Sequence, residues 1–152
     1  MSIWKKAIED AVEKTRANIT RFGDLFPHVS DEDGKYSLIT NNDWTNGFWT
    51  GILWLCYEYT KDEVFRNAAV RMEESFKLRF ENGSLEHHDI GFLFSLSTKA
   101  RWIVEKNEEC RTLTVKAADM LMKRFRPKAN IIQAWGSEGD PVNGGRIIID
   151  SL

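Results

Sequence analysis

The segment DWTNGFWTGILWLCYEY (residues 43–59) decides the fold. One stripe at helical spacing holds Trp44, Phe48, Ile52 and Leu55. Large apolar side chains also cover the other faces, and Asp43 can cap such a helix, which we expect from Trp44 to about Tyr59. A helix that is apolar nearly all round must be buried nearly all round, so the segment predicts an inner helix.

The segments that follow alternate between two kinds of helix. After Asp62, which can cap a helix, apolar residues form a one-sided stripe and charged residues occupy the rest. Residues 89 to about 106 carry few charges in their first half, whereas residues 107–126 show a conventional amphipathic stripe that Pro127 should end. Buried helices therefore alternate with helices that keep one face in water.

The first helix is expected over about residues 3–22, with Ser2 as its N-cap and Gly23 as its end. From Gly23 to Asn42 turn residues replace any hydrophobic period, which predicts a long loop, and long ordered loops are often functional. A second, Gly-rich loop follows Pro127, and the chain then enters an apolar run before Asp150.

An alternation of inner and outer helices is what a ring of helical hairpins produces. The sequence therefore predicts an all-α fold that is part of an α/α toroid. A bundle of four or five helices would also suit the composition, but its helices usually each keep a polar face.

The composition is that of one soluble globular domain. The chain has 152 residues, 42% apolar and 29% charged, with a formal charge of −2. No basic field supports binding to nucleic acid or to a membrane surface. Met1–Lys6 lack the apolar stretch of a signal peptide, so we expect a cytoplasmic protein. Cys56 and Cys110 are expected to be reduced, buried thiols.

Three segments carry residues suited to chemistry. In the first, Gly47 and Gly51 leave one helix face bare for a neighbouring helix or a ligand, while Trp44 and Phe48 share another face. Aromatic stripes are usually core, so tight packing explains the same pattern.

The second segment, residues 86–92, places His87, His88 and Asp89 at the start of a buried helix. Adjacent histidines point to different sides and make a poor chelating pair, so we expect no metal. Asp89 could be catalytic or merely the N-cap.

The third segment runs from Gln133 and Trp135 to Asp150. Asp150 follows three isoleucines, and apolar surroundings disfavour the charged form of a carboxyl group, which suits a general acid. A structural cap or a pair with Arg146 remains an equal alternative.

At these segments the chain resembles the unsaturated glucuronyl hydrolases, family 88 of the glycoside hydrolases. The resemblance rests on several long segments in the same order: residues 26–30, 43–58, 87–96, 131–136 and 144–150. It implies an (α/α)6 barrel, of which residues 1–152 are the N-terminal portion, about half. It also implies release of a 4,5-unsaturated glucuronic acid from the non-reducing end of lyase-generated oligosaccharides, without a cofactor.

The reaction implied is hydration of a vinyl ether: a proton is donated to C4, water adds at C5, and the resulting hemiketal opens. By motif, Asp150 matches the general acid and base, and Asp89 matches the second essential carboxylate. Trp44, Phe48 and Trp135 match residues lining the sugar pocket, and His88 matches a polar contact. The weaker candidates are His87, Asn46 and Gln133.

In the family the ring continues for about as long again. A half-ring would expose the apolar faces of its inner helices, so we expect either a fragment of a longer protein or self-association through the open edge. The alternatives are an unsaturated rhamnogalacturonyl hydrolase and an inactive sugar-binding fragment. A helical-repeat interaction module would not explain why Trp and Asp gather at helix entries.

Overall fold

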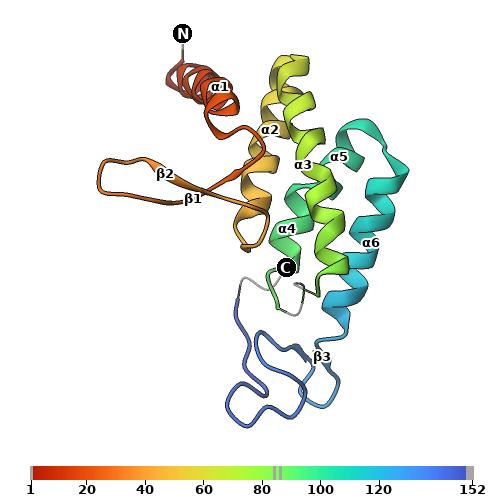
Figure 1. Ribbon diagram of the computed structural model, residues 1–152. Coiled ribbons are helices and arrows are strands. Elements are labelled where there is room, and N and C mark those ends of the chain that lie inside the picture. Colours follow the sequence, from red (N-terminus) through yellow and green to blue (C-terminus); the bar gives the residue numbers. More distant parts are fainter. Residues whose placement is uncertain (1, 84, 86, 150–152) are drawn as a thin grey trace.

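The computed structural model describes residues 2–83, 85 and 87–149 (Figure 1). The helices are α1 (Ile3–Phe22), α2 (Asn46–Thr60), α3 (Glu63–Glu81), α4 (Ile90–Leu96), α5 (Thr98–Glu105) and α6 (Glu108–Met122). Short antiparallel pairs are formed by β1 (Phe26–Ser30) with β2 (Tyr36–Ile39) and by β3 (Phe125–Arg126) with β4 (Ile131–Ile132). The all-α class is confirmed, since both strand pairs are small additions to a helical molecule.

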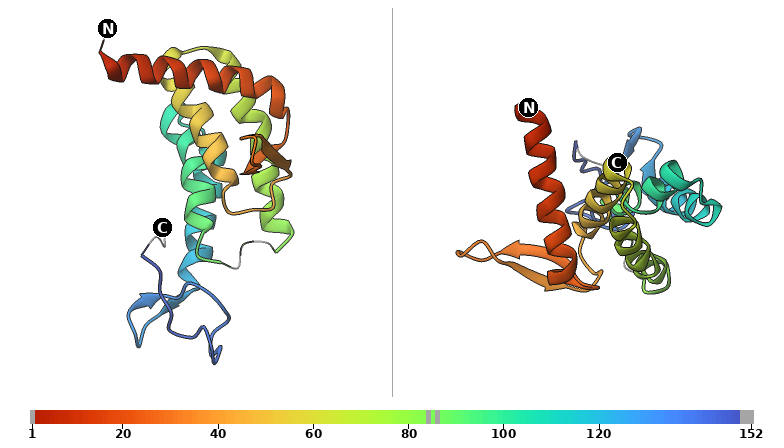
Figure 2. Two further views of the ribbon diagram at one scale, coloured as in Figure 1. Left: turned by 90° about the vertical axis from the view of Figure 1, so that its left-hand side faces the viewer. Right: turned by 90° about the horizontal axis from the view of Figure 1, so that it is seen from above.

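Helix α1 has the predicted bounds. The Ser2 hydroxyl accepts from the N–H of Lys5 at 3.3 Å, and Gly23 ends the helix at φ 56°, where a side chain would be strained. Figure 2 shows α1 lying across one end of α2 and α3, with its first turns projecting beyond them. Trp4 in this projecting part is 77% exposed.

The expected long loop after α1 is instead a β-hairpin. Phe26 pairs with Ile39, and its side chain, 1% exposed, packs edge to face on Phe76. The register shifts between Pro27 and Ser30, which breaks the alternation of buried and exposed residues. This irregularity explains why no strand period is visible in the sequence.

Helix α2 begins at Asn46, two residues later than predicted. Asp43 does not cap it: one carboxylate oxygen of Asp43 accepts from the Thr45 N–H at 2.9 Å and from the Thr45 hydroxyl at 2.6 Å. This local turn competes with the helix for residues 43–45. Within residues 1–152 the helix also keeps an open apolar face, as expected for part of a ring: Phe48, Ile52 and Leu55 are 41%, 43% and 66% exposed.

Helix α3 follows the prediction, with the Asp62 carboxylate accepting from the N–H of Val64 at 3.0 Å. The single helix expected over residues 89–106 is divided at Ser97 into α4 and α5. The Ser97 hydroxyl donates to the carbonyl of Leu93 at 2.5 Å, a local bond that competes with the helical ladder. Helix α6 ends at Met122, well before Pro127.

Helices α2 and α4 pack side by side with their first turns at the same end. A Cβ on Gly47 would lie 2.2 Å from the carbonyl oxygen of Phe92, and one on Gly51 would lie 3.2 Å from Cβ of Leu96. The contact partners advance in the same direction along both helices, from Gly47 to Gly51 on α2 and from Phe92 to Leu96 on α4, so the two helices are parallel. The bare glycine face serves a neighbouring helix rather than a ligand.

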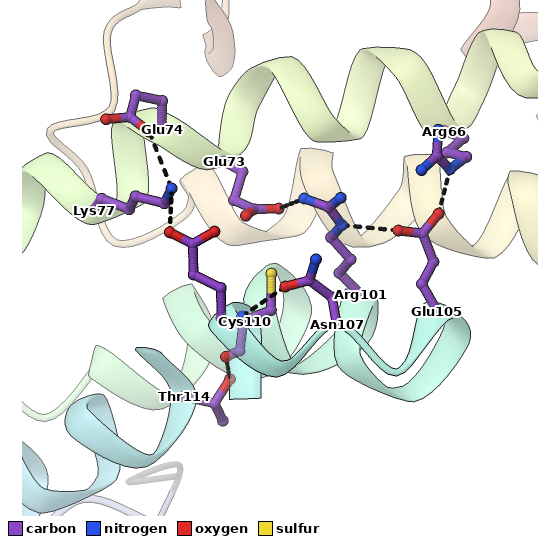
Figure 3. Close-up of polar contacts among 10 residues, drawn as sticks. Arg66, Glu73, Glu74, Lys77, Arg101, Glu105, Asn107, Cys110 and Thr114 are labelled. Atoms are coloured by element: carbon purple, nitrogen blue, oxygen red, sulfur yellow. Dashed lines mark hydrogen bonds and ion pairs between the residues drawn. The ribbon is translucent and has the colours of Figure 1, made fainter. Parts of the chain in front are cut away.

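An ion cluster fastens the outer helix α3 to α5 (Figure 3). Arg101 donates to Glu73 at 2.5 Å and to Glu105 at 2.8 Å, and Arg66 also pairs with Glu105. Burial raises the pKa of the Glu105 carboxyl, but hydrogen bonds and charge from the two arginines outweigh it and hold that pKa below its usual value.

Cys110 lies beside this cluster; it is buried, as is Cys56, and both are free thiols as expected. Burial and the neighbouring Glu73 raise the pKa of Cys110 to about 12. The thiol is therefore neutral near pH 7 and forms part of the packing. No helix within the described residues has the length and apolar character needed to cross a bilayer.

Candidate active site

The loops that lead into α2 and α4 meet at one end of the molecule, because the two helices are parallel. The segment that follows α6 lies beyond the same end (Figure 1). Segments 43–48, 87–92 and 133–136, which lie far apart in the sequence, therefore bound one region. These are the three segments singled out for chemistry.

Asp89 occupies the N-cap position of α4, but its side chain makes no capping hydrogen bond. Its carboxylate oxygens instead face two imidazoles, with Oδ1 3.2 Å from Nε2 of His88 and Oδ2 3.5 Å from Nδ1 of His87. The side chain is 16% exposed. The structure thus disfavours the cap interpretation and leaves Asp89 as a partly accessible carboxylate held by histidine.

The hydrogen bonds of His88 restrict where its protons lie. Nδ1 of His88 is 3.0 Å from the carbonyl oxygen of Ala134, which can only accept, so Nδ1 carries a proton. The other nitrogen, Nε2, faces Asp89. At 3.2 Å this contact is a hydrogen bond when either Nε2 or the carboxyl group carries a proton.

The position of Ala134 is set by Arg124 and Gln133. Arg124 donates to the carbonyls of Gln133, Ala134 and Gly136 at 2.7, 3.0 and 3.1 Å. The Gln133 side-chain amide donates to the carbonyls of Trp135, Gly136 and Ser137 at 2.6, 3.2 and 3.0 Å. Both side chains are buried, at 8% and 1% exposure, so they organise the loop from beneath.

An aromatic platform, defined as Trp44, Phe48 and Phe92, lies over the first turns of α2 and α4. Phe48 stacks on Phe92 with ring centres 5.6 Å apart, and Trp44 contacts both rings. Phe92 is three residues after Asp89, so the two lie on the same side of α4. Trp44 and Phe48 are 43% and 41% exposed, which leaves apolar ring faces available to a ligand.

Trp135 adds a third exposed ring at this end. It is 41% exposed and packs edge to face against His88 with centres 5.0 Å apart. Exposed aromatic faces beside a partly buried carboxylate suit a sugar ring, whose C–H faces are apolar and whose rim is polar.

Asn46 and Gln133 were expected to contact the substrate, but they lie below the surface. Asn46 is 0% exposed, and its Oδ1 accepts from the N–H of Asp43 at 2.7 Å, which fixes the turn that carries Trp44. In this geometry both residues act on the site by holding its loops. Asp150, the predicted acid, lies outside the described residues.

Asp43 joins the hairpin to the site. Its Oδ2 is 3.3 Å from Nε2 of His28 on β1, and its carbonyl accepts from Arg79 at 3.1 Å. Burial raises the pKa of the Asp43 carboxyl, but the bonds from Thr45 and the charges of His28 and Arg79 outweigh it and lower that pKa. A depression of 590 Å³ beside this pair is lined partly by Trp44 and Phe48.

Sequence reasoning missed three contributors: Phe92, His28 and Arg124. Phe92 could have been found from its spacing to Asp89, whereas nothing in the sequence linked His28 to Asp43 or Arg124 to residues 133–136. Within residues 2–83, 85 and 87–149, no three His, Cys, Asp or Glu side chains cluster as metal ligands.

Comparisons with known proteins identify the fold. Residues 18–136 match the family described as Glycosyl Hydrolase Family 88. The chain is 62% identical to the unsaturated glucuronyl hydrolase of Bacillus sp. (strain GL1), covering 99% of this chain and 40% of that protein. It is 41% identical to the unsaturated chondroitin disaccharide hydrolase of Streptococcus agalactiae serotype III (strain NEM316), covering 97% and 37%.

The crystal structure of unsaturated glucuronyl hydrolase from Bacillus sp. GL1 superposes with a TM-score of 0.93 at 61% identity, covering 98% of this chain and 40% of that one. The predicted part of an (α/α)6 barrel is thereby confirmed. The chain spans about 40% of the length of the curated relatives it matches. With its parallel inner helices and its matched residues 18–136, the chain belongs to glycosyl hydrolase family 88.

Proposed function

We propose that the chain is the N-terminal part of a glycoside hydrolase that releases 4,5-unsaturated glucuronic acid from the non-reducing end of lyase-generated oligosaccharides. The observation that carries the proposal is the His88–Asp89 pair, set beside the exposed rings of Trp135 and the aromatic platform. The 62% identity to an unsaturated glucuronyl hydrolase supports the same substrate class.

In this proposal the reaction is the hydration of a vinyl ether. Asp150 donates a proton to C4 of the double bond, water adds at C5, and the hemiketal opens to expel the remaining sugar. Asp89 contacts the sugar ring and is the second carboxyl group of the site. The contact with Nε2 of His88 at 3.2 Å fixes the orientation of the Asp89 carboxyl group, whose oxygens can accept hydrogen bonds from sugar hydroxyls.

In the proposed mechanism the aromatic rings bind the sugar and exclude water from its apolar faces. Trp44, Phe48 and Trp135 offer apolar faces to the sugar, and burial of such faces stabilises by about 25 cal/mol for each Å² removed from water. His88 orients Asp89, and Asn46 and Gln133 hold the two loops.

Substrate choice separates two versions of this function. The similarity to an unsaturated chondroitin disaccharide hydrolase favours glycosaminoglycan disaccharides as a second substrate set. The unsaturated rhamnogalacturonyl alternative has the same reaction but a pectin-derived substrate. A cytoplasmic location, compatible with the two free thiols, completes the proposal.

Helices α2 and α5 expose an apolar face to solvent. Phe48, Ile52, Leu55 and Ile103 border a groove of 280 Å³, and each is at least 41% exposed. We propose that the rest of the ring covers this face in the longer protein and that a second copy covers it in the isolated chain. Light scattering tests the second statement, because a well-folded monomer of 17.6 kDa would contradict it.

The functional test joins residues 1–152 to the remaining part of the Bacillus relative. We expect this hybrid to remove the ultraviolet absorbance of an unsaturated glucuronyl disaccharide, and residues 1–152 alone to remove little. In heavy water the hybrid should place deuterium at C4 of the released sugar, because the acid protonates that carbon. Cleavage without deuterium at C4 would exclude hydration. Faster turnover of an unsaturated rhamnogalacturonyl substrate would favour the alternative.

A further inference from the structure

The loop of residues 133–136 is connected to Asp89 through one continuous chain of hydrogen bonds. The carbonyl of Ala134 accepts from Arg124 at 3.0 Å and from Nδ1 of His88 at 3.0 Å. A carbonyl oxygen has two lone pairs, and these two donors use both. His88 then meets Asp89 through its other nitrogen at 3.2 Å.

We infer that Arg124 is a positioning residue: by clamping the 133–136 carbonyls it fixes the Nδ1-protonated form of His88 and so directs Nε2 at Asp89. The inference rests on the proposed function for its relevance to the reaction, but not for its geometry. Arg124 donates to the carbonyls of the 133–136 loop, and through the Ala134 carbonyl it acts on His88.

The shape of the guanidinium group explains why an arginine stands here. Its planar fork reaches the carbonyls of Gln133, Ala134 and Gly136 together, which a lysine ammonium on a flexible stem cannot do in one fixed geometry. The backbone adds to the clamp, since the carbonyl of Arg124 accepts from the N–H of Gln133 at 2.9 Å. Arg124 therefore holds the segment from both its side chain and its main chain.

A purely structural arginine would leave the protons of His88 unchanged. If the clamp sets them, loosening Ala134 removes the acceptor that keeps a proton on Nδ1. His88 would then sample the form with its proton on Nε2 alone, and that form can only donate to Asp89 from Nε2, with no fixed partner on Nδ1. The contact between Nε2 of His88 and Asp89 would lose its fixed geometry.

The test uses residues 1–152 without substrate. Nitrogen-15 NMR of the imidazole rings reports which ring nitrogens carry protons, and the chain has only three histidines to assign. We expect Nδ1 of His88 to be protonated in the unmodified chain and to lose protonation in Arg124→Lys. The matched control is Arg111→Lys, the same change at a 54% exposed side chain on α6, which should leave His88 unchanged.

Several results would overturn the inference. They are an unprotonated Nδ1 in the unmodified chain, a folded Arg124→Lys chain whose His88 signals match the parent, and an equal change in Arg111→Lys. If Arg124→Lys does not fold, Arg124→Gln, which keeps planar N–H donors, replaces it. Failure of both to fold would assign Arg124 to stability alone. Because no turnover is measured, an inactive hybrid would refute the proposed function and leave this result intact.

Discussion

Replacing Gly47 by alanine tests the packing that brings the site loops together. A Cβ there would lie 2.2 Å from the carbonyl oxygen of Phe92 and 2.9 Å from Cα of Leu93. Real contacts of this kind stay beyond 3.0 Å, so α2 and α4 must separate by at least the 0.8 Å difference. Both obstructing atoms belong to the backbone, which cannot rotate away as a side chain does.

The expected magnitude follows from two opposing effects. Overpacking costs about 1–3 kcal/mol, while alanine in place of glycine stabilises a helix by about 1 kcal/mol. Because a whole helix must shift, we take the overpacking cost at about 3 kcal/mol, the upper end of its range. After the gain from alanine is subtracted, Gly47→Ala should lower the free energy of unfolding by about 2 kcal/mol. For a chain of this length that corresponds to a fall of about 4–8 °C in the unfolding midpoint.

The assay is thermal or urea unfolding followed by circular dichroism, with Gly51→Ala as the matched control. The added Cβ in the control would lie 3.2 Å from Cβ of Leu96 and 3.3 Å from its carbonyl oxygen. Because both distances exceed 3.0 Å, a small shift relieves the contact, and the stability of the control should stay within about 1 kcal/mol of the parent. If Gly47→Ala proved as stable as Gly51→Ala, the close parallel packing of α2 on α4 would be refuted.

Three further predictions concern stability and reactivity. Asn107→Ala removes a cap bond of 2.9 Å to the N–H of Cys110 and should cost about 1 kcal/mol in urea unfolding; an unchanged midpoint would refute the cap. Cys110, with its pKa near 12, should react with a thiol reagent at pH 8 at the rate of unfolding, and rapid labelling of the folded chain would contradict its burial. Because the pKa of Glu105 is lowered, its contribution to stability is present above the usual carboxyl pKa and is lost as the pH falls through the lowered value. Glu105→Gln should therefore flatten the acid side of the curve of unfolding free energy against pH. An unchanged curve would count against the ion cluster.

The parts of the fold that the sequence predicted correctly depend on local chemistry. Asp62 caps α3, as its place before an apolar stripe indicated, and Gly23 ends α1 in a conformation that favours glycine. Asp43 looked like the same kind of cap, but Thr45 lies two residues later and binds its carboxylate in a separate turn. Two local bonds decided that difference, and hydrophobic spacing does not reveal them.

The candidate site was predictable only in part, because its residues meet through tertiary contacts. The histidine partners of Asp89 are its sequence neighbours, so the segment itself pointed to them. Arg124 and Ala134 come to His88 only because the chain turns back after α6. The burial of Asn46 likewise depends on the packing of α2, which spacing alone does not fix.

The most direct test of the central claim compares carboxylate variants of the hybrid that joins residues 1–152 to the rest of the Bacillus relative. Turnover of an unsaturated glucuronyl disaccharide is measured for the parent, Asp150→Asn and Asp89→Asn, with Asp119→Asn on the exposed face of α6 as the control. We predict that both site variants lower kcat by about 10²–10⁴ and that the control matches the parent. Normal turnover by a folded Asp150→Asn protein would contradict the account.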